Sequence, residues 1–290
     1  MKPPSFDQVC TKALQLPCSP LLLPRLIGVL AKEDSTSEEL ESIIRIDPAL
    51  ASSTLRLANS AFFAAATPVE SVSEAIFRLG QRETYRLAAL SLAGRWMSLN
   101  IDGYRWEPGD FCRHSLCRAI AAQHLAERTG RGDPSVAYTA GLVCTVGKLA
   151  IAYACGDCFP DIRAHQKAQN CTWLEAERAV LGYDFAEAGG RLLQQWRFPP
   201  LLVAAAQHQL DPAQAPEDMQ PILATLHAAQ YLATAMGAGV SEEGFLFEIN
   251  GDFLTANGFT STLLDEALPV VLERAFSVLN DRLNTGAVKF

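Results

Sequence analysis

The chain has 290 residues, 49% of them hydrophobic and 19% charged, and its formal net charge is −8 at pH 7. A sequence this apolar is not intrinsically disordered, and its length predicts about two domains or subdomains. The negative charge and the lack of a basic run argue against a nucleic-acid surface, because phosphate binding requires clustered Lys and Arg.

The sequence carries no signal for secretion or membrane insertion. No uninterrupted apolar run reaches the roughly 18 residues that a bilayer-spanning helix needs. The N-terminal segment Met1–Asp7 lacks the apolar stretch and small-residue cleavage site of a signal peptide. We therefore expect a cytoplasmic protein without a membrane partner.

Helix-start signals recur through the first third of the chain. Ser35–Glu38 predicts a capping box ahead of an apolar helix face. Asp47-Pro48 then supplies an N-cap and an N1 proline for a second helix. Ser71–Glu74 repeats the capping box, and Gly80 is the expected stop of the helix that follows.

The rest of the chain is equally helical in pattern. Asp133-Pro134 predicts another helix start, and Thr172–Glu175 and Asp184–Glu187 predict two more capping boxes. The best strand candidate is Phe245–Ile249, which has no partner strand. The sequence therefore predicts an all-α fold.

Two segments break the helical pattern. Asn100–Asp110 contains two glycines and a proline, which predicts a subdomain boundary. We expect an N-terminal helical subdomain over 14–100 and a second helical subdomain over 104–285. Asp211–Pro221 carries three prolines and is expected to join two helices of the second subdomain.

An ordered series of motifs carries a family resemblance. The sequence reads DPAL at Asp47–Leu50, LRLANSAF at Leu55–Phe62 and SVSEAIFRLG at Ser71–Gly80. This series resembles the HDOD family of bacterial signalling domains, which are relatives of the HD-superfamily metal-dependent phosphohydrolases and typically lack their metal-binding residues. The likeness covers roughly residues 14–240 and continues through Phe111–Ser115, Gly182–Asp184 and Gln195–Pro199. It implies two packed helical bundles with an HDOD, HD-like fold.

The segment Ala140–Leu149 resembles the central signature of the HD superfamily, a His-Asp pair just before a Gly-Lys-Leu segment. Here the positions of the pair hold Cys144 and Thr145. A carboxylate binds a hard divalent ion through charged oxygen, and a Thr hydroxyl is a poor neutral substitute. The frame of an active-site helix is kept without its His-Asp pair.

The resemblance also assigns the other positions of the degenerate metal site. His114 matches the upstream His, and His208 matches a later one. Phe185 stands where related sequences often have His, and Gln230 stands at the final Asp position. Because no carboxylate is matched, we expect no catalytic residue, no bound metal and no cofactor.

Two interpretations of the remaining ligand types stay open. His114, Cys144 and His208 could together bind a soft ion such as zinc or copper(I). Alternatively, His114 and His208 are hydrogen-bonded interior histidines, as we expect for His124 and His227, which lie on apolar helical stretches.

The eight cysteines do not form a recognisable framework. Cys155 and Cys158 make a lone CxxC with helical flanks, whereas a thioredoxin-like motif needs a βαβ setting and a structural zinc site needs two further ligands. We expect reduced thiols and neither a redox nor a zinc site. The other cysteines are Cys10, Cys18, Cys112, Cys117, Cys144 and Cys171.

Two groups of residues are candidates for an interaction surface. Arg78, Arg82 and Arg86 follow at four-residue steps and are expected to share a helix face, as a solvated surface or an anionic docking patch. Asn59 and Ser60 match an Asn-Ser pair at a helix end of the related family. They either satisfy free backbone groups or belong to a surface that a partner contacts.

Three functions from different classes fit these observations. The first is a non-catalytic signal-transduction module that acts through protein–protein interaction, with a partner in trans from a two-component or cyclic-dinucleotide pathway, as the resemblance implies. The second is a residual metal-dependent phosphohydrolase or phosphodiesterase. The third is a cyclic-dinucleotide or nucleotide sensor without turnover, binding near Lys148. We favour the first, with a change in packing between the two bundles as its mechanism.

Overall fold

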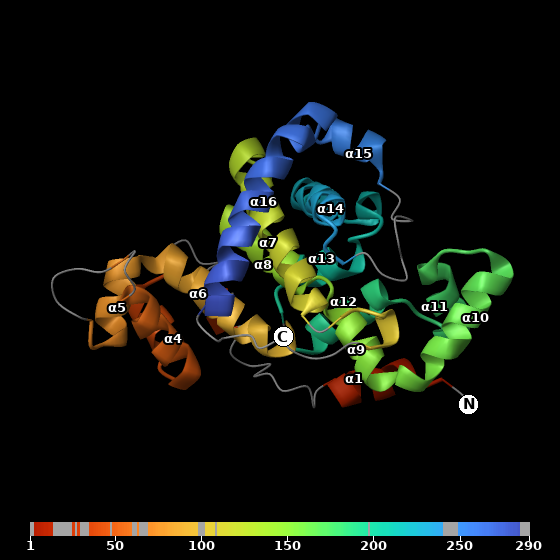
Figure 1. Ribbon diagram of the computed structural model, residues 1–290, viewed down its shortest axis with the longest axis horizontal. Helices are drawn as coiled ribbons and strands as arrows, with labels where there is room; N and C mark the ends of the chain where they lie inside the picture. The colour runs from red at the N-terminus through yellow and green to blue at the C-terminus, as the bar shows by residue number, and fades with distance from the viewer. Residues whose placement is uncertain are drawn as a thin grey trace. The chain divides into compact units, whose positions relative to one another are not determined.

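The computed structural model describes a helical protein (Figure 1). The described residues are 3–13, 25–26, 28–29, 35–46, 48–59, 63, 69–97, 102–107, 109–196, 198–239 and 249–284. These residues form α-helices and short 3-10 helices, and none of them forms a strand. The predicted all-α fold is confirmed. Of the predicted strand Phe245–Ile249, the residues before Ile249 lie outside the described part of the chain.

The chain divides into two compact units. The smaller unit is Pro17–Arg95, and the larger unit combines Met1–Leu16 with Trp96–Phe290. The predicted break over Asn100–Asp110 falls between helices α6 and α7, where a 3-10 helix, η1 (Asp102–Tyr104), lies. The larger unit also includes the first helix of the chain, so it is discontinuous in sequence.

The smaller unit contains helices α3 (Ser37–Ile44), α4 (Pro48–Ala58), α5 (Val72–Leu79) and most of α6 (Gln81–Met97). Helix α5 packs against both α3 and α4. One hydrophobic cluster of this unit joins the end of α4 to α5 and is formed by Ala58, Val69, Ala75 and Leu79.

The caps of the smaller unit agree with the predicted helix starts to within one residue. The capping box of α3 is formed by Thr36 and Glu39, one position later than predicted, because Thr36 has the extended backbone of an N-cap. Ser71 caps α5 by accepting from the Glu74 amide, and Gly80 ends α5 with a positive φ of 78°. Asp47, the predicted cap of α4, lies outside the described residues.

The prediction that Arg78, Arg82 and Arg86 share one helix face is wrong. Arg78 lies in the last turn of α5, whereas Arg82 and Arg86 lie in α6. Gly80 interrupts the helix between them, and its positive φ breaks the four-residue periodicity on which the prediction depended.

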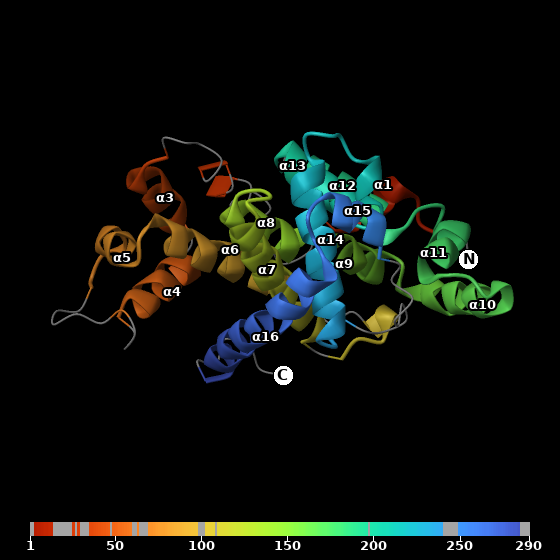
Figure 2. The same ribbon diagram turned by 90° about the horizontal axis from the view of Figure 1, so that it is seen from above.

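The larger unit is built around helix α7 (Asp110–Thr129), which packs against α8 (Pro134–Val143), α14 (Gln220–Ala235) and α16 (Ser261–Asn284). Figure 2 shows α14 and α16 beside α7 in this unit. A second layer is formed by α9 (Val146–Ala154), α12 (Phe185–Gln195) and α13 (Pro200–Gln207). Helix α12 packs against both of the others. The remaining helices are α1 (Phe6–Ala13), η2 (Gly156–Cys158), α10 (Phe159–Gln169), α11 (Trp173–Leu181), η3 (Pro212–Gln214) and α15 (Gly251–Ala256).

The predicted helix starts of the larger unit are confirmed. Asp133 caps α8 through the amides of Ser135 and Val136, with Pro134 at the first helical position. Thr172 and Glu175 form a reciprocal capping box at α11. At α12 the Asp184 side chain accepts from the Glu187 amide, which is the N-cap half of the predicted box. The proline-rich segment Asp211–Pro221 joins α13 to α14, as expected.

Helices α8 and α9 together form a long apolar stretch of the described chain. Within those residues, Pro134–Ala154 is the one stretch long and apolar enough to cross a bilayer, and 89% of its most apolar window is buried inside the fold. The chain bends within this stretch at Cys144 and Thr145, between the two helices. Its composition is therefore explained by its place in the core.

Helix α9 crosses α12 at very short range. A Cβ atom added to Gly147 of α9 would collide with the carbonyl oxygen of Phe185 and lie 2.6 Å from the amide nitrogen of Gly189, both in α12. A glycine is required at Gly147 because any side chain there would collide with backbone, which cannot move aside without separating the helices.

Candidate functional site

The degenerate signature lies at the buried junction of α8 and α9. Cys144 and Thr145 are 0% and 1% exposed. The Cys144 thiol donates to the Gly141 carbonyl at 3.4 Å, and burial raises its pKa. The Thr145 hydroxyl lies 3.5 Å from that of Ser115 on α7. Both side chains are neutral groups with local partners, and neither supplies an anionic ligand.

His114 is a neutral interior histidine on α7. It is 1% exposed, and its Nδ1 donates to the Ala238 carbonyl at 3.0 Å, since a carbonyl oxygen can only accept. Burial and the positive charges of Arg118 and Lys148 hold its pKa well below the usual range. Among the described residues, Nε2 has no hydrogen-bond partner. This arrangement is typical of a metal-ligating histidine, but the nearby charges are cations.

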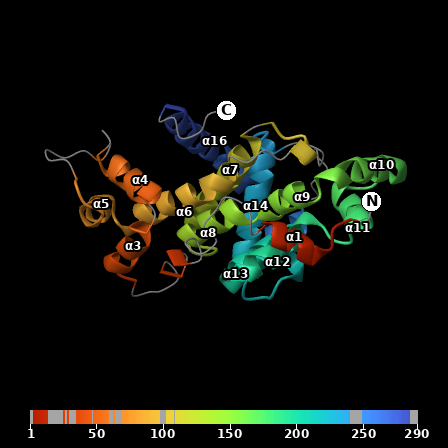
Figure 3. The same ribbon diagram turned by 90° about the horizontal axis from the view of Figure 1, so that it is seen from below.

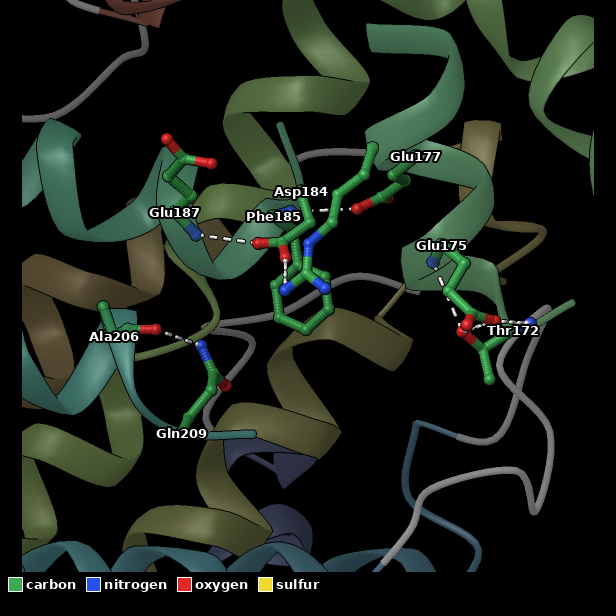
Figure 4. Close-up of polar contacts among 9 residues, drawn as sticks. Thr172, Glu175, Glu177, Asp184, Phe185, Glu187, Ala206 and Gln209 are labelled. Carbon is green, nitrogen blue, oxygen red and sulfur yellow. Dashed lines mark hydrogen bonds and ion pairs between the residues drawn. The ribbon is translucent and has the colours of Figure 1, made fainter. Parts of the chain in front are cut away.

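Gln209, rather than His208, connects the helices around this junction. His208 ends α13 and is half-buried, whereas Gln209 is 3% exposed. The Gln209 amide donates to the Cys144 carbonyl at 2.8 Å and the Ala206 carbonyl at 2.9 Å, and its side-chain oxygen accepts from Arg118 at 2.8 Å. Figure 4 shows the bond from Gln209 to Ala206. Gln209 was not predicted from the sequence because a local motif does not show which of two adjacent residues faces inward.

The two remaining predicted positions lie on different helices and do not supply ligands. Gln230 on α14 bonds within its own helix, donating to the Thr234 hydroxyl at 3.1 Å. Phe185 begins α12, and its ring lies 4.7 Å from the Lys148 ammonium. An aromatic face therefore borders the site where related sequences often have an imidazole.

Lys148 is a fully buried cation in an aromatic surround. It is 1% exposed, and its Nζ lies 4.7 Å from the Trp106 ring centroid and 5.4 Å from that of Tyr104. Such contacts stabilise a desolvated ammonium by about 2 kcal/mol. Arg118 is equally buried. A lysine or arginine inside an apolar helix is the sequence signal for this pair, and only Lys148 was considered from the sequence.

Glu177 on α11 organises the wall beside Lys148. It is completely buried and accepts three hydrogen bonds, from the Tyr104 hydroxyl at 2.6 Å, the Trp173 indole at 2.8 Å and the Phe185 amide at 2.9 Å. Figure 4 shows the Glu177 carboxylate directed at the start of α12. The sequence analysis missed this residue because its partners are up to 73 positions away.

The donor set does not fit a metal ion. Across the described residues, no three His, Cys, Asp or Glu side chains come together closely enough to hold one. His114, Cys144 and His208 are all described, so the fold does not bring them together as a soft-metal site. The nearby carboxylates are engaged elsewhere: Glu177 in its three hydrogen bonds and Asp184 in the cap of α12 (Figure 4). Asp184 also forms an ion pair with Arg178.

The cysteines that the structure describes are free thiols. Cys155 precedes η2 and Cys158 is the last residue of η2; both are buried, and burial raises the pKa of each thiol. Burial likewise raises the pKa of Cys117 to about 11. Thiols in this state are poor nucleophiles at neutral pH. The side chain of Cys10 and the whole of Cys18 lie outside the described residues.

The predicted interaction residues have mixed roles. The Asn59 side chain donates to the Val69 carbonyl at 2.9 Å and accepts from the Val69 amide at 2.7 Å, so it holds Val69 at the end of α4. Arg86 pairs with Glu83 at 2.6 Å, and Arg82 is exposed. Ser60 lies outside the described residues. The sequence analysis missed Phe77 on α5, a side chain that is 90% exposed.

The chain has a family match and structural relatives. Its residues 16–212 match the HDOD domain family. An uncharacterized protein of Treponema pallidum (strain Nichols) is 25% identical over 215 residues, which are 73% of this chain and 40% of that protein. The chain thus spans about two fifths of the length of this curated relative.

Two crystal structures share the fold. A protein named "Putative phosphohydrolase" from Shewanella amazonensis SB2B is 27% identical, with a TM-score of 0.65 over 92% of this chain and 93% of that one. A protein named "Putative signal transduction protein" from Marinobacter aquaeolei VT8 is 23% identical, with a TM-score of 0.71 over 94% of this chain and 64% of that one.

Proposed function

Because the chain belongs to the HDOD domain family, we propose that it is a non-catalytic regulatory module that transmits a signalling state by binding another protein. The proposal includes a partner in trans, from a two-component or cyclic-dinucleotide pathway, and a cytoplasmic site of action without nucleic acid or membrane.

One observation carries this proposal: the two positions of the His-Asp pair hold Cys144 and Thr145, neutral side chains whose hydrogen-bond partners lie inside the fold. Cys144 and Thr145 are buried in local contacts, and Gln209 joins the α8–α9 junction to Arg118. Metal-dependent phosphoester hydrolysis requires ligands that fix an ion and activate water. These residues stabilise a packed core instead.

The charges of the same region also disfavour a divalent cation. Arg118 and Lys148 are each 1% exposed, and both lower the pKa of His114. They therefore lie within electrostatic range of the imidazole whose Nδ1 is hydrogen-bonded and whose Nε2 has no partner among the described residues. A divalent ion at His114 would be repelled by these two buried cations.

The first test is metal content and turnover of the purified, untagged chain. After gel filtration in chelator-free buffer, we expect less than about a tenth of an equivalent of any transition metal. Hydrolysis of bis(p-nitrophenyl) phosphate with added Mn²⁺, Mg²⁺ or Zn²⁺ should equal that of His114→Ala. Near one equivalent of metal, lost in His114→Ala or His208→Ala, would overturn the proposal in favour of a phosphohydrolase.

The second test concerns the partner surface. Phe77 is 90% exposed on α5, and exposed aromatic side chains are enriched at protein interfaces. Screening against receiver-domain and cyclic-dinucleotide-turnover proteins should give a saturable complex that Phe77→Asp weakens about tenfold or more. Ser42→Asp, at an exposed position of a different helix, α3, is the control and should bind normally. Equal affinities for the two variants would exclude this face.

A second candidate, a cyclic-dinucleotide or nucleotide sensor without turnover, is favoured by one observation. Arg118 and Lys148 place two positive charges inside the larger unit, and phosphates bind such groups. Isothermal titration with cyclic dinucleotides and mononucleotides tests it. Saturable binding that Lys148→Met abolishes would support a sensor, and the absence of heat up to millimolar ligand would leave protein binding as the function.

A further inference from the structure

The N-terminal helix α1 is separated in sequence from the rest of the larger unit. The chain begins in that unit with α1, continues through Pro17–Arg95 in the smaller unit, and returns at Trp96. The smaller unit is therefore connected to the larger one at both of its ends. The second connection, at Trp96, leads into α7 in the core of the larger unit. The first connection, at Leu16, is anchored in the larger unit only as firmly as α1 is docked there.

Helix α1 packs against α9 and α12 (Figure 3). Val9 is its buried anchor, 1% exposed. The Phe6 ring meets the Tyr183 ring edge-on at 5.4 Å, and the Arg191 guanidinium of α12 lies 4.6 Å from the same Phe6 ring.

Two hydrogen bonds complete the docking. The Tyr183 hydroxyl donates to the Pro4 carbonyl at 3.1 Å. Lys12 donates to the Ala154 carbonyl at 3.3 Å, where its positive charge complements the C-terminal end of α9. Both contacts are polar and part-buried, so each can be replaced by a hydrogen bond to water if the helix leaves its site.

The contacts of α1 are few compared with those of the core helices. It has eight residues, and helices of that length are not stable alone in water. Asp7, Gln8 and Thr11 are exposed, and with Pro4 and Lys12 they line a hollow of about 430 Å³ along the helix. Elements with few buried contacts open locally without global unfolding.

We propose that α1 is a releasable clasp. Docked, it holds the first connection of the smaller unit on the larger unit. Released, it leaves only the α6–α7 end of the smaller unit anchored by a packed helix of the larger unit, and it uncovers the surface of α9 and α12 that it occupied. The proposal rests on the regulatory function above, because a switch between one and two anchored ends gives the module two states that a partner can distinguish.

Cys155 reports this release. It is 1% exposed, follows the Ala154 carbonyl that Lys12 contacts, and lies 3.6 Å from the Tyr183 hydroxyl that holds Pro4. Cys144, 0% exposed at the α8–α9 junction, is the internal reference, because it becomes accessible only when the core opens.

The experiment measures N-ethylmaleimide labelling of each cysteine in the folded full chain, by peptide mass spectrometry. If the clasp opens, Cys155 is labelled at least about 100-fold faster than Cys144. Phe6→Ala should raise the Cys155 rate about tenfold further, and Lys12→Ala about threefold. Thr11→Ala, on the exposed side of α1, should change neither rate.

Equal rates for Cys155 and Cys144 in the wild-type chain would overturn the proposal. So would an unchanged Cys155 rate in both Phe6→Ala and Lys12→Ala, provided that circular dichroism shows each variant folded. Labelling needs no partner, so failure here leaves the proposed protein-binding function intact. Conversely, a failure to find a partner would leave the labelling result unaffected.

Discussion

His124 and His227 are both buried, but among the described residues only the ring of His227 forms hydrogen bonds. Neither ring nitrogen of His124 on α7 has a partner among the described residues. His227 on α14 bonds the Gln209 carbonyl through Nδ1 at 3.2 Å, and its Nε2 accepts from the Asn250 amide at 3.0 Å. Burial lowers the pKa of both, and for His124 the charges of Arg274 and Arg128 add to it.

These states predict opposite effects of the same substitution. His124→Leu should stabilise the protein by about 1 kcal/mol, because it removes buried polar atoms that lack partners. His227→Leu should destabilise it by about 2–3 kcal/mol, because two backbone groups lose their partner. Urea unfolding at pH 7.5 measures both, and the same sign for the two variants would contradict the prediction.

The stability should also depend on pH through these histidines. A folded-state pKa below the unfolded value of about 6.5 means that the unfolded chain binds the proton first. The contribution of a neutral histidine is therefore complete above about pH 6.5 and is lost as the pH falls below it. The advantage of His124→Leu over wild type should grow from pH 7.5 to pH 5.5.

Gln209 is the second residue with a testable role. Its side chain bonds Arg118, Cys144 and Ala206, so Gln209→Ala should destabilise the protein by about 2–4 kcal/mol. Half-buried His208 is the matched control, and His208→Ala should cost less than about 1 kcal/mol. A larger loss for His208→Ala in urea unfolding would return His208 to the centre of the site.

At the scale of elements, the crossing of α9 and α12 depends on Gly147. Gly147→Ala should destabilise the protein by about 3 kcal/mol, because the added Cβ would collide with α12 backbone. Gly156→Ala is the control, since a Cβ there meets nothing within 4 Å among the described residues. Thermal unfolding followed by circular dichroism gives the midpoint of each variant. Equal midpoints for Gly147→Ala and Gly156→Ala would show that α9 and α12 can move apart without a loss of stability.

Local signals predicted where elements begin better than which faces they share. The caps at Ser71, Asp133, Thr172 and Asp184 were predictable because each bond spans two or three residues. The shared face of Arg78, Arg82 and Arg86 was not, because one left-handed glycine between helices changes the direction of everything after it.

At the scale of the molecule, the two units have separate cores. Ile76 is 1% exposed in the smaller unit and Leu192 is 0% exposed in the larger. Ile76→Ala and Leu192→Ala should each cost about 2–5 kcal/mol, and each should reduce amide protection mainly in its own unit. Hydrogen exchange by mass spectrometry locates the loss. Loss of protection spread evenly over both units would show that the chain unfolds as one cooperative body.

The sequence by itself determined the all-α fold, the family and most helix starts of the larger unit, because hydrophobic periodicity, capping and ordered motifs are local properties. It also predicted that Cys144 and Thr145 stand in place of a His-Asp pair. Only the tertiary structure decided what replaces that pair: Gln209, 65 residues from Cys144, and the cations Arg118 and Lys148 in a core closed by Glu177. Hydrogen bonds and charge interactions between distant helices depend on how those helices pack, and a local pattern does not contain that information.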